Sequence, residues 1–222
     1  MFPNWEEDRT TKNSIYVELR RLIIIRRFIP GERFDVEAIA QQFKTSVTPV
    51  RDALQMLSQD GLVNIKPRSG YFVARTTLKQ LRDLLDLRHI LEVAAVERAA
   101  VKITQEQIAE LRAVHAGYTG DDDESYARYT DENRKFHYCL ARASGNYELT
   151  QMIGRLHDRL APFMVTRHSG RTQEITHKSI IDALEKHDID AAREALLTDI
   201  ERSQELVLDK VLKEEAESWH VG

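Results

Sequence analysis

Apolar residues recur at spacings of three and four over most of the chain, which is the pattern of helices with one buried face. The first such segment spans residues 11–27 and is followed by a turn at Pro30-Gly31. The pattern returns at shorter length over residues 36–43, where Asp35 is in position to cap the helix. Two short amphipathic helices are therefore expected in this part of the chain.

A third helix is predicted after residue 47. Thr48 stands before Pro49, and this pair favours a helix start at Thr48, because Thr caps free amides and Pro is tolerated at the first helical position. Gly61 is expected to end the helix. Its two faces differ in character: Val50, Leu54 and Leu57 form an apolar stripe, and Thr48, Arg51 and Gln55 form a polar one.

Two strand-like runs follow this helix, at residues 62–66 and 71–74. The segment between them, Pro67-Arg68-Ser69-Gly70, has the composition of a turn and carries a cation at its tip. Three helices followed by a basic hairpin are the element order of a winged helix-turn-helix, a DNA-binding module. The alternative is a small helical subdomain that binds nothing.

Strand signals end near Arg75-Thr76-Thr77, where a linker is expected. The predicted organisation is a DNA-binding domain at residues 1–75, a linker at 76–78 and an all-α domain at 79–222. Helical periodicity or helix-start signals mark six segments of this all-α domain, which we call the body, at residues 78–102, 104–115, 125–144, 148–165, 174–186 and 189–213. The fold class is therefore mainly α, with a winged helix-turn-helix and an antiparallel bundle of six or seven helices.

Composition agrees with a helix-rich globular protein. The 222 residues include 42% apolar side chains, and only 9 Gly and 5 Pro. No apolar run approaches the roughly 20 residues that a membrane span needs, and the first residues lack a basic-then-apolar leader pattern. Cys139 is the one cysteine, so no intrachain disulfide is available. We therefore expect a cytoplasmic protein without membrane contact.

Charge is divided unevenly between the two parts. Residues 1–75 carry 12 Lys and Arg against 9 Asp and Glu, and the other residues carry 20 against 27, so the parts have net charges of +3 and −7. A basic DNA-binding domain joined to an acidic second domain would show this asymmetry. The charge distribution thus favours double-stranded DNA as a partner of the first domain only.

The first domain offers candidate DNA contacts of three kinds. Arg51 and Gln55 have the side chains that read guanine and adenine edges in the major groove. Ser46 and Thr48, near a helix start, suit a phosphate. The remaining candidates, for phosphate or minor-groove contact from the predicted wing and beside it, are Arg33, Lys66, Arg68, Ser69 and Gly70. The alternative for each charged side chain is an ordinary surface charge.

The body contains two pairs of residues with metal-ligand chemistry. Asn133 and His137 are four apart and lie on one helix face, and His177 and Asp199 fall on two successive predicted helices. Imidazoles with oxygen ligands suit a divalent metal such as zinc, nickel or manganese. The alternative is hydrogen-bonded core histidines. The other histidines, expected at the surface or in the core, are His89, His115, His157, His168, His187 and His220.

Arginines of the body suggest an acidic ligand. Arg88 and Glu92 lie on the apolar side of the first body helix, where they form either a buried ion pair or, through Arg88, a site for a carboxylate. Arg155 and Arg159 repeat one helical turn apart and are candidates to line the same cavity. The candidate effector site thus consists of these four residues.

Catalytic patterns are weak. Cys139 lies two residues after His137 inside a predicted helix, without the strained turn of a nucleophile, and the sequence has no glycine-rich phosphate loop and no HExxH motif. We therefore expect a protein that is not an enzyme. Two alternatives stay open, a metal-dependent enzyme of the bundle and a non-catalytic adaptor protein.

The first domain resembles the GntR family of bacterial transcription regulators. The resemblance covers about 45 residues through the segments PGERFDVEAIAQQF, TSVTPVRDALQMLSQDGLV and PRSGYFVA. Members of that family often carry Arg where this chain has Val47. The family implies a DNA-binding repressor that recognises a short palindromic operator as a homodimer.

The body is similar to the FadR-type ligand-binding domain of that family, the class called FCD, through LRHILEVAAVERAA, NRKFHYCLARASGN and THKSIIDALEKHDIDAAREAL. This resemblance implies a bundle that binds a small organic acid and often a metal. The family's metal ligands are Asp or Asn, His four residues later, and two further His separated by 22 residues. The matching positions here are Asn133, His137, His177 and Asp199, so Asp stands where the last His is usual.

Overall fold

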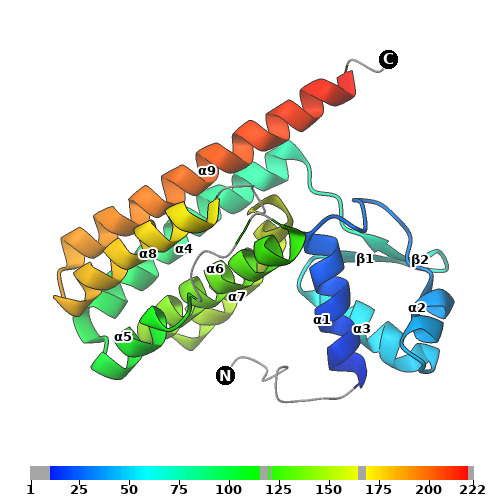
Figure 1. The fold of residues 1–222 in the computed structure, drawn as a ribbon, viewed down its shortest axis with the longest axis horizontal. Coiled ribbons are helices and arrows are strands. Elements are labelled where there is room, and N and C mark those ends of the chain that lie inside the picture. Colours follow the sequence, from blue (N-terminus) through cyan, green and yellow to red (C-terminus); the bar gives the residue numbers. More distant parts are fainter. Residues whose placement is uncertain (1–10, 116–119, 121, 165–168, 220–222) are drawn as a thin grey trace. The chain divides into compact units, whose positions relative to one another are not determined.

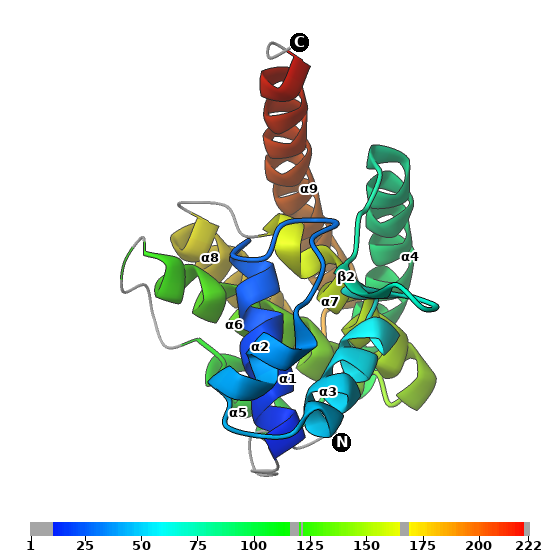
Figure 2. The same ribbon diagram turned by 90° about the vertical axis from the view of Figure 1, so that its right-hand side faces the viewer.

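The computed structural model describes residues 11–115, 120, 122–164 and 169–219, which form nine helices and one two-stranded sheet (Figures 1 and 2). The chain separates into two compact units, Met1–Thr76 and Thr77–Gly222. The boundary coincides with Thr77, which caps the next helix by accepting a hydrogen bond from the amide of Gln80.

The first unit consists of three helices and a hairpin. Its helices are α1 (Thr11–Ile24), α2 (Val36–Gln42) and α3 (Val47–Gln59), and its strands are β1 (Val63–Lys66) and β2 (Gly70–Val73). The strands pair antiparallel, with Val63 opposite Val73 and Lys66 opposite Gly70. One core joins all five elements and includes Leu19, Ile39, Leu54 and Val73. This is the predicted winged helix-turn-helix.

The start of α3 differs from the prediction. Ser46, not Thr48, is the N-cap residue, and its side chain makes no capping hydrogen bond. Pro49 is then the third helical residue, which the helix accepts because amides of the first turn have no intrahelical partner. The end of the helix is as predicted, since Gly61 has a φ of +78° and the amide of Leu62 donates to the carbonyl of Leu57.

The hairpin has a third neighbour that the sequence pattern did not indicate. Arg33 forms a β-bridge with Phe72, flanked by hydrogen bonds from the Phe34 amide to the Tyr71 carbonyl and from the Val73 amide to the Glu32 carbonyl, both 2.9 Å. The loop before α2 is thereby fixed along β2. The contact positions Arg33 beside the wing.

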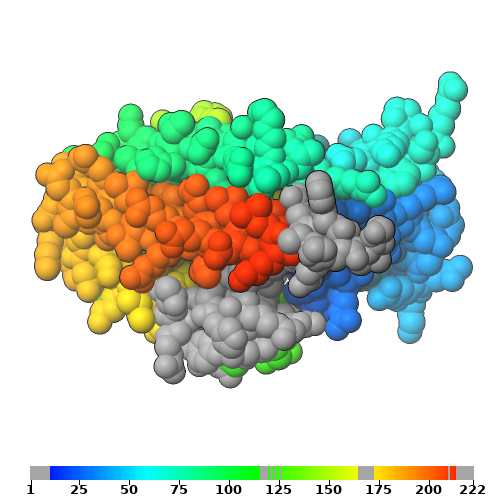
Figure 3. Space-filling view, turned by 90° about the horizontal axis from the view of Figure 1, so that it is seen from above, coloured from blue at the N-terminus to red at the C-terminus, as the bar shows by residue number. Residues whose placement is uncertain are grey.

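The second unit is a helical bundle. Its helices are α4 (Leu78–Lys102), α5 (Gln105–Arg112), α6 (Asp123–Ala143), α7 (Tyr147–Met164), α8 (Ser169–Glu185) and α9 (Ile189–Trp219). Helix α4 packs against α6, α7 and α9, and α8 packs against α9. The surface view shows α4 and α9 side by side along one face of this unit (Figure 3). The described residues contain no helix long and apolar enough to cross a membrane.

Most predicted limits of the body helices are accurate to a few residues. Thr104 and Gln107 form the expected capping box at the start of α5. Pro162 neither ends α7 nor prevents its last turn, since the helix continues to Met164. The main core of the bundle is apolar, with Phe136, Leu140, Ile180 and Leu196 among its buried members. A group of buried polar residues lies beside this core.

Candidate functional site

Helix α3 presents the predicted polar stripe to solvent. Thr48, Arg51 and Gln55 are exposed, whereas Val50 and Leu54 on the opposite face are fully buried. The helix packs against the core through its apolar face, so the fold does not depend on contacts of these polar side chains. An exposed Arg and Gln one turn apart have the chemistry to read base edges in a major groove.

The wing gathers the predicted basic residues. Lys66, Arg68 and Ser69 are exposed, and Arg68, with a φ of +61°, lies at the tip. The ammonium group of Lys66 lies 4.6 Å from the centre of the Phe72 ring, on the strand that Arg33 bridges. The Arg33 guanidinium lies so close to Gly70 that a β-carbon there would be 3.3 Å from its Nε. Two cations of the hairpin, Lys66 and Arg68, and a third beside it, Arg33, thus lie close to the wing.

Val47 has a packing role. It is the first residue of α3, is partly buried and contacts the core of the first unit. Ser46, next to it, is exposed at the helix N-terminus, where amides point outward. An arginine at position 47 would have to leave this packing position to reach DNA.

Arg88 is the centre of the buried polar cluster in the second unit. Its side chain is 0% exposed and makes three strong contacts: Nε donates to Glu92 at 2.9 Å, Nη1 to Ser203 at 2.6 Å and Nη2 to Asp199 at 3.1 Å. Burial lowers the pKa of Arg88, but the carboxylates of Glu92 and Asp199 outweigh it and raise the pKa. The buried ion pair considered from the sequence is therefore present, with a second carboxylate added.

His137 connects the two carboxylates. Its Nδ1 lies 2.8 Å from Glu92 Oε2, and its Nε2 lies 3.3 Å from Arg88 Nη2 and 3.5 Å from Asp199 Oδ2. Burial would raise the pKa of both carboxyls, but the charges of Arg88 and His137 lower the pKa of Glu92, and a hydrogen bond with His137 and the charge of Arg88 lower the pKa of Asp199. Both acids are therefore anions in the folded protein.

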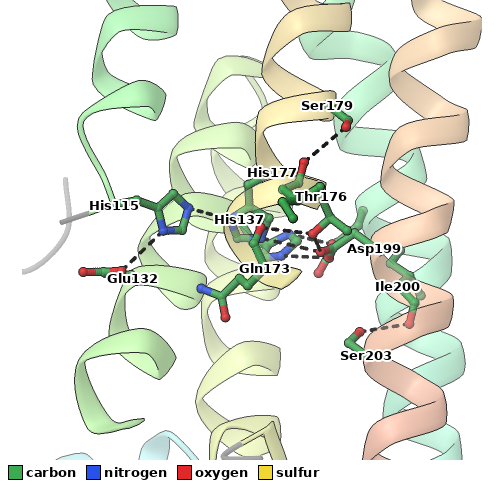
Figure 4. Close-up of polar contacts among 12 residues, drawn as sticks. His115, Glu132, His137, Gln173, Thr176, His177, Ser179, Asp199, Ile200 and Ser203 are labelled. Carbon is green, nitrogen blue, oxygen red and sulfur yellow. Dashed lines mark hydrogen bonds and ion pairs between the residues drawn. The ribbon is translucent and has the colours of Figure 1, made fainter. Parts of the chain in front are cut away.

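His177 completes the inner side of the cluster (Figure 4). The ring is fully buried and stacks on Phe136 with 3.7 Å between ring centres and 9° between ring planes. Its Nε2 lies 3.7 Å from Asp199 Oδ1, which accepts a 2.6 Å hydrogen bond from Thr176. Burial lowers the pKa of His177 well below its ordinary value, so the ring is neutral.

Two histidines without an expected metal-ligand role belong to the cluster. His157 is buried on α7 and places Nε2 2.5 Å from Glu92 Oε1, and burial lowers its pKa to about 4. His115 follows α5 and places Nε2 2.8 Å from His177 Nδ1. Apolar periodicity in α7 puts His157 on the buried face, a signal available in the sequence. His115 has no such signal, and His168 and His220 lie outside the described residues.

Two predicted members of the effector site do not join the cluster. Arg155 and Arg159 are both exposed on α7, and Arg155 donates to the carbonyl of Gln151 in its own helix. They face solvent because they lie opposite the buried positions Ile153, Leu156 and Leu160 of α7. The expectation that they line the same cavity as Arg88 is therefore wrong. Asn133 is buried on α6, one turn before His137.

The residues of the cluster fit a divalent cation. His137, His177 and Asp199 each offer a ligand atom, and these atoms lie within 4.8 Å of one another. Nε2 of His177 is a buried nitrogen without a hydrogen-bond partner among the described residues. Nitrogen and carboxylate oxygen are the ligands that zinc, nickel and manganese share. Arg88 contacts two of the three donors, so a cation would have to compete with its guanidinium.

Cys139 has no catalytic environment. It is buried on α6, and burial raises the pKa of its thiol to about 12, so the reactive thiolate is scarce at neutral pH.

An exposed recognition helix with a basic wing, joined to a helical unit with a buried charged site, defines a DNA-binding regulator with a ligand-binding domain. Comparison with known families gives the same class. Residues 11–73 match the model of bacterial regulatory proteins of the gntR family, and residues 83–202 match the FCD domain. The chain belongs to the GntR family of transcriptional regulators and carries an FCD domain.

Individual relatives agree with this assignment. The chain is 27% identical over 196 residues to the uncharacterized HTH-type transcriptional regulator YdhC of Bacillus subtilis (strain 168), covering 83% of this chain and 85% of that protein. It is 26% identical over 212 residues to the HTH-type transcriptional repressor RspR of Escherichia coli (strain K12), covering 93% and 92%. The structure of E. coli McbR/YncC has the same fold, with a TM-score of 0.75 at 22% identity over 91% of this chain and 99% of that one.

Proposed function

We propose that this regulator is a homodimeric repressor whose affinity for its operator is controlled by a small organic acid in the second unit. The observation that carries the proposal is Arg88, a buried guanidinium surrounded by carboxylates and imidazoles inside a domain of the ligand-binding class. The relative RspR, which matches nearly the whole chain, is a transcriptional repressor. The sign of regulation follows from that likeness.

The operator is read by α3 and held by the wing. Arg51 and Gln55 contact base edges, and Ser46 and Thr48 contact phosphate near the helix start. Arg33, Lys66 and Arg68 add contacts that weaken as salt increases, because they release counterions from the DNA backbone. Ser69 and Gly70 give the wing tip its small profile and let it approach the duplex.

The dimer is supported by an exposed apolar stripe on α4. Leu87, Ile90 and Val101 are 37%, 64% and 66% exposed and lie on one side of the helix. Two copies of α4 that pair antiparallel about Ala94 would place Leu87 opposite Val101 and Asp86 opposite Lys102. A twofold axis makes such a surface complementary to itself, because each contact occurs twice. The stripe therefore suits a second copy of the chain.

Effector binding involves an exchange of partners at Arg88. If Asp199, His137 and His177 hold a divalent cation, Arg88 loses one acceptor and a buried positive charge is left less well paired. A carboxylate effector supplies the replacement, since the planar guanidinium matches a carboxylate in two hydrogen bonds. The effector and the cation then stabilise one state of the domain together, and this shifts the populations of operator-binding states.

A gel-shift experiment with the full-length protein tests this function. The DNA is the region upstream of its own gene, and the additions are small organic acids with and without zinc, nickel or manganese. We expect specific binding at moderate salt that an acid weakens, and a larger effect when metal and acid are both present. Absence of specific binding to that DNA at any salt concentration would contradict the proposal.

A further inference from the structure

The feature that carries a further inference is a row of three side chains, Glu132, His115 and His177, leading from α6 to the inside of the cluster (Figure 4). We propose that His115 and Glu132 are positioning residues that keep the proton of His177 on Nδ1 and leave Nε2 as a ready ligand for a divalent cation. This inference rests on the proposed metal site. It adds two residues that the family pattern of ligands does not contain.

The row begins with a carboxylate. Glu132 Oε2 lies 3.3 Å from His115 Nδ1, and Glu132 Oε1 lies 3.5 Å from the guanidinium of Arg128, one turn earlier on α6. Both side chains of the His115 contact are about nine-tenths buried. An ionised carboxylate only accepts hydrogen bonds, so His115 must present an N–H on Nδ1. In the neutral imidazole, Nε2 is then the nitrogen with the lone pair.

The contact between His115 and His177 determines which nitrogen of His177 carries the hydrogen. His115 Nε2 lies 2.8 Å from His177 Nδ1, a distance at which one nitrogen donates and the other accepts. Because the lone pair of His115 is on Nε2, the proton belongs to His177 Nδ1. The neutral ring of His177 therefore carries its own lone pair on Nε2, the nitrogen that lies 3.7 Å from Asp199 Oδ1.

The opposite assignment is less favourable. A hydrogen on His177 Nε2 would be a buried donor, and Asp199 Oδ1 at 3.7 Å lies beyond hydrogen-bond distance and already accepts from Thr176. A buried donor without an acceptor is unfavourable, because it loses its hydrogen bonds to water and gains none in the protein. The stacked ring of Phe136 also limits how far His177 can turn to relieve it. The geometry thus favours a lone pair facing the ligand atoms of His137 and Asp199.

His137 also has its Nε2 on the side of Asp199, at 3.5 Å from Oδ2. Arg88 Nη2 lies 3.3 Å from this nitrogen, and because a guanidinium only donates hydrogen bonds, the neutral ring of His137 has its lone pair on Nε2. Metal-binding histidines commonly donate their second nitrogen to a carboxylate, which fixes the tautomer and raises the basicity of the ligand nitrogen. His177 reaches such a carboxylate, Glu132, through His115. Both rings are therefore oriented toward the same three-donor site.

The first measurement needs no metal. In chelator-treated full-length protein labelled with ¹⁵N-histidine, long-range proton–nitrogen spectra report which nitrogen of His177 carries hydrogen. We expect the Nδ1–H form in the unaltered protein and a gain of the Nε2–H form in His115→Ala. An Nε2–H form in the unaltered protein, or no change in His115→Ala, would overturn the proposal.

The second measurement is zinc affinity, determined by competition with a chromogenic chelator. We expect His177→Ala to lose the site and His115→Ala and Glu132→Gln to weaken binding by about 10- to 100-fold, as changes behind a metal ligand usually do. His89→Ala, an exposed histidine of α4, is the matched control and should bind like the unaltered protein. Glu132→Gln keeps the shape of the side chain, so it tests the row even if His115→Ala fails to fold.

The outcomes distinguish failure of the positioning role of His115 and Glu132 from failure of the metal site on which that role depends. Loss of zinc in His177→Ala with unchanged affinity in His115→Ala and Glu132→Gln would overturn the row and leave the metal site intact. No zinc binding by the unaltered protein would overturn both. Operator binding in the gel shift, measured on the same preparations, tests the regulator itself independently of either result.

Discussion

Arg88 on α4 and Asp199 on α9 form a hydrogen-bonded ion pair of 3.1 Å across 111 residues of sequence, and neither side chain is more than 7% exposed. Ser203, one turn further along α9, accepts a second hydrogen bond from the same guanidinium. The two long helices of the body are thus joined by a charged contact inside the protein. A buried cation depends on its anions, because its ionised form loses most of its hydration.

Removal of Asp199 should therefore destabilise the body strongly. We expect Asp199→Ala to lower the free energy of unfolding by about 3–5 kcal/mol, the usual cost of leaving a buried charge without one partner. Urea unfolding followed by circular dichroism measures it. Asp182→Ala is the matched control, since Asp182 pairs with Arg112 at a distance of 3.2 Å with both side chains more than 40% exposed. It should cost less than about 1 kcal/mol, and equal losses in the two variants would contradict a central role for the buried pair.

Arg51 is the residue of α3 whose loss should most affect operator recognition. We expect Arg51→Ala to weaken specific DNA binding by about 1–3 kcal/mol, the discrimination that one good base contact provides. The fold should be unchanged, because the side chain is exposed. Fluorescence anisotropy with operator and unrelated DNA measures both specific and background affinity.

The control for this experiment is Arg155→Ala, which removes an exposed arginine of the same charge from α7 in the other unit. It should bind operator like the unaltered protein. Sequence-specific binding that survives in Arg51→Ala would mean that α3 reads DNA through other residues.

The fold could be predicted because its information is local. Apolar spacing, capping residues and glycine stops predict the hairpin and the nine helices of the described residues, including the capping box at Thr104 and the end of α3 at Gly61. The start of α3 was misplaced because Ser46 and Thr48 are both capping residue types and Pro49 is acceptable anywhere in a first turn. The bridge from Arg33 to Phe72 depends on tertiary contact and leaves no periodic signal.

The site could be predicted only in part, for a related reason. Arg88 and Glu92 are one turn apart on a single helix, so periodicity alone places them together and inward. Periodicity places His157 on the buried face of α7, but its contact with Glu92 depends on how the helices cross. The position of His115, after α5, depends on helix crossing alone. Arg155 and Arg159 illustrate the converse, because their spacing shows that they share a face, and the apolar residues Ile153, Leu156 and Leu160 mark the opposite face of α7 as the buried one.

The apolar stripe on α4 gives a prediction about assembly. We expect Ile90→Asp to convert a dimer to a monomer in sedimentation experiments, because the change replaces an apolar contact with a charge that must lose its hydration at the interface. Met152→Asp, which places the same charge on another exposed apolar residue, on α7, should leave the dimer intact. A dimer that persists in Ile90→Asp and is lost in Met152→Asp would place the interface on a different face.

Burial of His157 predicts that acid destabilises the body through this residue. Burial holds the pKa of His157 at about 4 in the folded protein, and in the unfolded chain it returns to about 6.5. The unfolded chain therefore binds the proton first, so the stabilising contribution is present above pH 6.5 and is lost as the pH falls toward 4. The full difference corresponds to about 3 kcal/mol in the free energy of unfolding.

His157→Gln tests this dependence, because the amide of Gln can still donate to Glu92 and does not titrate. In chelator-containing buffer, urea unfolding between pH 7 and pH 4 should show a shallower loss of stability for His157→Gln than for the unaltered protein. The difference in the free energy of unfolding between the two proteins should therefore narrow as the pH falls. His89→Gln changes an exposed histidine of α4 and should keep the original profile. Parallel curves for His157→Gln and the unaltered protein would show that His157 does not carry the acid sensitivity.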